Sequence, residues 1–95
     1  MKIGHQWQNK QTKQLFKAIL KLKTANEAAK FFRDLCTLEE IEEMAKRWQA
    51  VQMLKKGRSY RKIAQTTGLS TTTVTRVSHW LNHGEGGYKL ILKRI

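Results

Sequence analysis

Polar side chains recur at helical spacing in the segment 70–79, which reads STTTVTRVSH. Most carry small hydroxyl groups, and one guanidinium and one imidazole stand among them. A helix over this segment turns one set outward, namely Ser70, Thr71, Thr72, Thr75, Arg76 and His79. An arginine can donate two hydrogen bonds to guanine, and threonine methyl groups can contact those of thymine. The set therefore predicts a helix that reads bases in the major groove of double-stranded DNA.

The residues around this helix indicate how a preceding helix and a turn would position it. Ala64 is small enough to let two helices cross closely, and Gly68 can take the positive φ that ends a first helix. Ser70 is a favourable N-cap for the second helix. Val74 and Val77 then face back toward the first helix. The pattern is typical of a helix-turn-helix, although two short helices in any small helical domain share parts of it.

Charge is distributed in a way that favours a polyanion as partner. The chain of 95 residues has a formal net charge of +12, and from Lys55 onward it holds nine Lys and Arg residues against one acid, Glu85. Five of these cations flank the predicted reading helix. We expect phosphate contacts, with salt-dependent affinity, from Lys55, Lys56, Arg58, Arg61 and Lys62.

Membrane association is not expected. A basic helix on a membrane surface needs a strong division into apolar and basic faces, which the predicted reading helix lacks. The longest apolar runs are a few residues, too short to span a bilayer.

A single cysteine, Cys36, leaves no internal disulfide framework and fits a reduced, cytoplasmic setting.

The apolar pattern and the absence of proline predict an all-α protein. A first helix is expected over about 10–22. A second begins at a capping box, Thr24-Ala-Asn-Glu27. A third runs from Thr37 to about Lys56, and Gly57 supplies its C-cap. The third of these is apolar on more than one side, which indicates burial on several sides. In so short a chain a second subunit is the expected cover, so a homodimer is predicted.

We expect a single domain over residues 1–95. Residues 10–56 would form a helical dimerisation core, residues 59–83 the helix-turn-helix, and residues 84–95 a glycine hinge with a short C-terminal helix. That last helix is too short to be stable alone, so it must dock on the body or on a partner.

Catalysis and metal binding are not expected. The acidic residues Glu39, Glu40, Glu42 and Glu43 lie in the first turns of the third predicted helix, where capping and the helix dipole explain them. His79 and His83 are spaced i, i+4 but lack an obvious third ligand. No glycine-rich phosphate loop or nucleophile elbow is present, so we predict no enzyme, no metal and no resident cofactor.

With these elements placed, the chain resembles the tryptophan repressor family over roughly residues 31–82. The resemblance rests on Thr37 opening the long helix, Arg47 ten residues later, Lys55-Lys-Gly-Arg-Ser59, and Thr72-Thr-Val-Thr-Arg76-Val-Ser78. Phe31-Phe-Arg-Asp-Leu-Cys-Thr37 and Gly86-Gly-Tyr88 are similar to segments of tryptophan-repressor-related proteins of unassigned ligand. The resemblance implies an intertwined all-helical homodimer with two reading heads.

The resemblance also implies a small-molecule site. In tryptophan repressors the corepressor lies between two guanidinium groups and near a threonine, and these positions match Arg47, Arg76 and Thr37. Two positions differ, since Val77 stands where the family has glycine and Trp80 where it has serine. We therefore expect no response to L-tryptophan. Trp80 either fills the corepressor slot as a built-in substitute or packs the end of the reading helix.

The sequence thus predicts a sequence-specific, dimeric DNA-binding transcription regulator, with any small-molecule effector unassigned. One alternative is a ligand-independent DNA-binding module, such as the reader of a transposase-like assembly. A second is a protein–protein adaptor, against which the basic excess after residue 54 argues.

Overall fold

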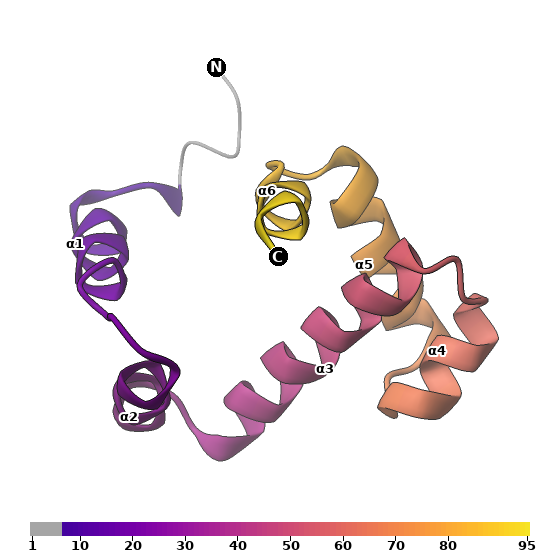
Figure 1. The fold of residues 1–95 in the computed structure, drawn as a ribbon, viewed down its shortest axis with the longest axis horizontal. Helices are drawn as coiled ribbons and strands as arrows, with labels where there is room; N and C mark the ends of the chain where they lie inside the picture. The colour runs from indigo at the N-terminus through magenta and orange to yellow at the C-terminus, as the bar shows by residue number, and fades with distance from the viewer. Residues whose placement is uncertain (1–6) are drawn as a thin grey trace. The chain divides into compact units, whose positions relative to one another are not determined.

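The computed structural model describes residues 7–95, and all regular structure in that range is helical (Figure 1). The predicted all-α class is confirmed. The elements are α1 (Lys10–Ile19), α2 (Ala25–Leu35), α3 (Leu38–Lys55), α4 (Tyr60–Thr67), α5 (Thr71–His83) and α6 (Gly87–Arg94). Within residues 7–95, no helix is both long enough and apolar enough to cross a membrane.

The chain divides into two compact units at Thr37. The first contains α1 and α2, and the second contains α3 to α6. The sequence predicted a single domain. That single domain, with its division into a dimerisation core, a helix-turn-helix and a C-terminal segment, stays a prediction.

The helices of the first unit begin at side-chain caps. At α1, Asn9 Oδ1 accepts from the Thr12 amide at 2.9 Å, and Thr12 Oγ1 accepts from the Asn9 amide at 2.8 Å. The helix ends at Ile19, before the expected Leu22, because the amides of Lys21 and Leu22 bond to carbonyls three residues back and tighten the chain into a turn.

The cap of α2 differs from the predicted capping box in one bond. Thr24 Oγ1 accepts from the Glu27 amide at 3.1 Å, as expected. The Glu27 carboxylate, however, accepts from the Lys23 amide at 2.9 Å and not from Thr24. The carboxylate still lies in the first turn, where its negative charge interacts favourably with the positive end of the helix dipole.

Neither α1 nor α2 contains a buried residue. Phe16 is 44% exposed and Leu20 is 82% exposed, although Phe16 packs edge to face on Trp7 with ring centroids 6.0 Å apart. A stable unit needs apolar surface removed from water. The first unit therefore has no core of its own within a single chain.

The second unit has a closed core between α3, α4 and α5, which lie against one another in Figure 1. Its buried residues are Ala50, Val51, Ile63, Leu69, Val74 and Val77. Tyr88 and Leu92 of α6 pack against this core, so the C-terminal helix docks on its own body.

The long helix α3 is only half covered. Its buried residues, Ala50 and Val51, lie in the C-terminal half, whereas Leu38 is 51% and Met44 is 40% exposed. One chain alone does not bury α3 on several sides, and the predicted cover by a second subunit stays a prediction. At the C-terminal end, Gly57 takes φ 78°, and the amides of Gly57 and Arg58 bond to carbonyls of the last turn, as the predicted glycine cap requires.

Candidate nucleic-acid interface

The turn between α4 and α5 is fixed by local hydrogen bonds. Gly68 adopts φ 81°, and its amide bonds to the Ala64 carbonyl at 2.9 Å. The buried Thr67 hydroxyl donates to the Ile63 carbonyl at 2.7 Å and accepts from the Leu69 amide at 3.2 Å. The buried Thr67 hydroxyl thus has both a donor and an acceptor partner, and these bonds help to fix the direction of α5.

The start of α5 and its seat on α4 are also held by side chains. Ser70 Oγ accepts from the Thr73 amide at 3.1 Å and caps the helix, as predicted. The Tyr60 hydroxyl and Ser78 Oγ lie 2.5 Å apart, and this bond joins the first turn of α4 to the middle of α5. The sequence pattern does not predict this contact, because residues 18 apart give no periodic signal.

The two faces of α5 differ in burial. Val74, Val77 and Ser78 are buried. The predicted reading residues are all exposed, namely Ser70, Thr71, Thr72, Thr75, Arg76 and His79. The structure thus brings the set together on one exposed surface, and DNA contact by these residues stays a prediction.

One reading residue is partly committed to its own helix. The Thr75 hydroxyl donates to the Thr71 carbonyl at 2.9 Å, so its oxygen retains only acceptor capacity. Among the outward residues Arg76 is the only one with a planar, multidonor group. Direct recognition of guanine would therefore depend on this side chain.

The predicted phosphate contacts are exposed and uncompensated. All five cations are exposed, and none forms an ion pair with another residue of the described range, namely Lys55, Lys56, Arg58, Arg61 and Lys62. They occupy the end of α3, the loop and the first turn of α4. A cationic surface beside an exposed polar helix is the electrostatic arrangement of a nucleic-acid interface.

The residues that the resemblance assigns to a corepressor site lie on separate elements. Thr37 closes the first unit, while Arg47 lies on α3 with its Nε 3.4 Å from the Glu43 carboxylate. Val77 is fully buried in the core and does not project into an open slot. Arg76 is exposed on α5. Ligand binding at these positions stays a prediction.

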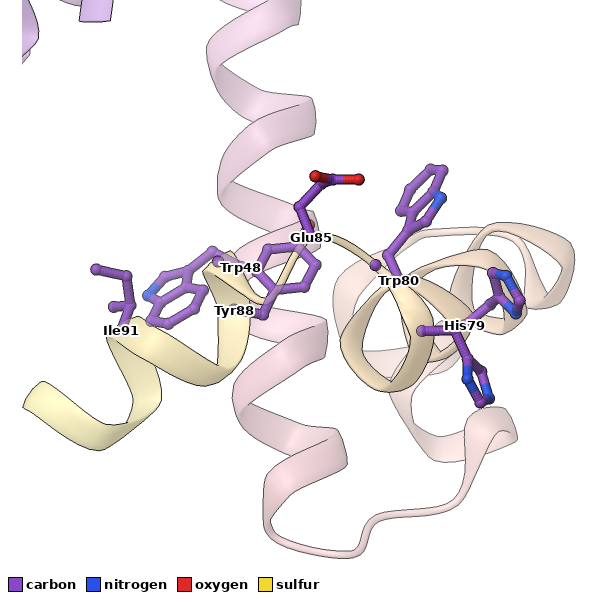
Figure 2. Close-up of a pocket in the computed structure, with 9 residues that line it drawn as sticks. Trp48, His79, Trp80, Glu85, Tyr88 and Ile91 are labelled. Carbon is purple, nitrogen blue, oxygen red and sulfur yellow. The ribbon is translucent and has the colours of Figure 1, made fainter. Parts of the chain in front are cut away.

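A surface groove of about 880 Å³ lies instead between the end of α5, the loop after it and α6 (Figure 2). Of the implied ligand residues only Trp80 lines it. Trp48 and Tyr88 have ring centroids 6.3 Å apart and form one side of the groove, a contact that the sequence pattern does not predict. The full lining is Trp48, His79, Trp80, His83, Gly84, Glu85, Gly87, Tyr88 and Ile91.

Trp80 is 43% exposed in the single chain. In the described range no guanidinium stacks on its ring, and the ring is not sealed into the core either. Both interpretations of this residue, a built-in substitute and a packing residue, stay predictions.

The two histidines of α5 lie side by side, with ring centroids 5.2 Å apart. Over residues 7–95 there is no group of three or more His, Cys, Asp or Glu side chains that could hold a metal ion. The rings add polar surface to the groove.

Comparison with known proteins places this geometry in a family. The family described as Trp repressor protein matches residues 10–95. The uncharacterized protein YerC of Bacillus subtilis (strain 168) is 44% identical over 86 residues, which is 90% of this chain and 83% of that protein.

Two solved structures share the fold. A TrpR-like protein from Eubacterium eligens ATCC 27750 is 41% identical with a TM-score of 0.90, covering 95% of this chain and 93% of that one. A Staphylococcus aureus protein whose name also refers to the Trp repressor is 37% identical with a TM-score of 0.91, covering 99% and 94%. The chain therefore belongs to the Trp repressor family, a family of DNA-binding regulators.

Proposed function

We propose that this protein is a dimeric transcription regulator that reads a specific DNA site through α5 and does not respond to L-tryptophan. The observation that carries the proposal is the division of α5 into a face locked in the core and a face of exposed small polar residues around Arg76. An exposed helix of this kind, set at the second position of a helix-turn-helix, fits the major groove.

Base and phosphate contacts would be divided between elements. Arg76 and the threonines of α5 face the bases, while the exposed cations of the loop and α4 fix the orientation on the backbone. With a single bidentate donor, direct reading is limited. By analogy with the Trp repressor, water-mediated contacts and DNA shape supply the remaining specificity.

Dimerisation is supported by apolar surface that one chain leaves uncovered. The first unit has no buried residue in its helices, and the N-terminal half of α3 exposes Leu38 and Met44. A second copy that covers these surfaces would give the first unit the core it lacks. Two copies also supply two reading heads, which suits half-sites spaced by about one DNA turn, roughly 34 Å.

Independence from L-tryptophan is supported by two side chains. Val77 is packed in the core at the position where the family has glycine, and a branched side chain there restricts rearrangement. Trp80 places its own indole ring in the groove beside α6.

Selection of bound sites from random duplex DNA tests the proposal, followed by electrophoretic mobility of the selected site at two salt concentrations. A selected consensus and an affinity that falls steeply with salt are expected. A protein–protein adaptor would yield neither a consensus nor a steep salt dependence, and that result would refute the proposed function.

A further inference from the structure

One face of α1 consists of lysines. Lys10, Lys13 and Lys17 are spaced three and four residues apart, so they project from the same side of the helix. All three are exposed, and together with Gln14 and its neighbours they line a shallow depression of about 420 Å³. We call these three residues the lysine face.

The lysine face is unfavourable for the helix that carries it. Like charges three or four residues apart repel and destabilise a helix. No acidic residue occurs in α1, and none of the three lysines forms an ion pair within residues 7–95. The helix dipole favours Lys17 in the last turn but disfavours Lys10 at the start of the helix. A local feature that weakens its own element is a candidate for function.

The net positive charge of the protein is divided evenly between the part that carries the lysine face and the part that carries the reading head. Residues 1–37 hold eight Lys and Arg against two acids, and residues 38–95 hold eleven against five, so each part has a net charge of +6. Half of the net positive charge of the protein thus lies in residues 1–37, outside the unit that contains the helix-turn-helix.

We propose that the lysine face binds backbone phosphates of the same DNA duplex, outside the segment that α5 reads. This inference rests on the proposed function. Lys10 and Lys17 are about 10 Å apart along a helix, and one strand of B-DNA carries one phosphate per about 3.4 Å of axis, so the face spans about three phosphates. Gln14, which lines the same depression, adds amide donors that suit phosphate oxygens.

An anionic membrane is the main competing partner for such a helix, because the side opposite the lysines carries Leu15 and Ile19. Both are partly buried already, and Phe16 packs on Trp7. The proposed dimer uses this apolar side, which leaves the lysine face outward. DNA is favoured because the same chain carries an exposed helix-turn-helix.

The test compares two duplexes by fluorescence anisotropy over a range of salt. One is the selected site alone, about 20 bp, and the other adds about 15 bp on each side, which is more than one turn of DNA. The wild type should bind the longer duplex more tightly. Lys10→Gln/Lys13→Gln/Lys17→Gln keeps good helix formers and should remove that gain, lowering the salt slope on the longer duplex by up to about 2.7 per protomer.

A matched variant, Lys23→Gln/Lys30→Gln/Lys89→Gln, removes the same charge from exposed positions off the lysine face and should retain the gain. If the wild type binds both duplexes equally, or the two variants behave alike, the inference is wrong while binding to the short duplex still supports the proposed function. If the short duplex is not bound, the proposed function itself fails.

Two further measurements distinguish DNA from the other possible partners of the lysine face. Flotation with phosphatidylserine vesicles that is lost in the lysine-face variant, with DNA binding intact, would overturn the inference in favour of a membrane. A weaker dimer in sedimentation, again with DNA binding intact, would assign the lysine face to acidic residues of a second copy and would also overturn it.

Discussion

Arg76 is the residue on which sequence choice depends most. It is the one exposed side chain of the reading face that can make a bidentate contact with guanine. Arg76→Ala should weaken binding to the selected site by roughly 1–3 kcal/mol and relax the preference at one base pair. Anisotropy titrations on the selected duplex and its single-base variants measure both effects.

The matched control for Arg76 is a cation assigned to the backbone. Arg58→Ala or Lys62→Ala should weaken binding to every sequence alike and reduce the salt slope by about one unit. If Arg76→Ala also weakened all sequences equally, Arg76 would belong with the phosphate contacts.

Val77 and Trp80 decide the ligand question. Isothermal calorimetry should detect no binding of L-tryptophan to the wild type, and micromolar binding would contradict the account. Trp80→Ser combined with Val77→Gly, which also reopens the slot that the branched side chain restricts, separates the two roles of Trp80. A built-in substitute predicts weaker DNA binding that added indole compounds restore, whereas a packing residue predicts a lower melting temperature that no indole repairs.

At this scale the sequence predicted the outward set of α5 and the caps Ser70 and Gly68, because each follows from spacing along one helix or one turn. It did not predict the Tyr60–Ser78 bond or the approach of Trp48 to Tyr88, since both join residues distant in the chain. Val77 was assigned two roles from the sequence, and burial in the core agrees with its helical spacing.

Among the elements, the turn between α4 and α5 depends on one glycine. Gly68 has φ 81°, and a Cβ there would meet only Lys46 Nζ at 3.9 Å. Gly68→Ala should therefore destabilise the protein through backbone strain alone, by about 1–2 kcal/mol. Chemical denaturation monitored by circular dichroism measures the change.

Gly87→Ala is the control for that substitution. Gly87 is the first residue of α6 and has no positive φ, and a Cβ added there would meet no atom within 4 Å. Alanine is the better helix former, so this variant should be neutral or more stable, by up to about 1 kcal/mol. Equal destabilisation by both variants would show that the φ of Gly68 is not the cause.

The helix ends were predicted well where caps and periodicity agree, as at Gly57, Gly68 and Ser70. The early end of α1 and the altered α2 cap were not, because Lys21, Leu22 and Glu27 each had more than one local bonding choice. The groove beside α6 was also missed, since it depends on how α6 docks against α3 and α5.

For the whole molecule, the exposed apolar surface of α1, α2 and the first half of α3 predicts a dimer. Sedimentation at micromolar concentration should give about twice 11.1 kDa. A folded monomer under those conditions would contradict the intertwined arrangement. The sequence indicated the dimer from the apolar pattern of α3, but it could not show that one chain divides at Thr37.

The central claim, that this protein reads DNA through α5, is tested most directly by one titration. The affinity of the wild type is measured for the selected duplex and for a scrambled duplex of equal length and composition, across several salt concentrations. The selected duplex should be bound at least about tenfold more tightly, with a log–log salt slope of about −4 or steeper from five backbone cations per head. Equal affinity for both duplexes, or binding that salt leaves unchanged, would contradict the claim.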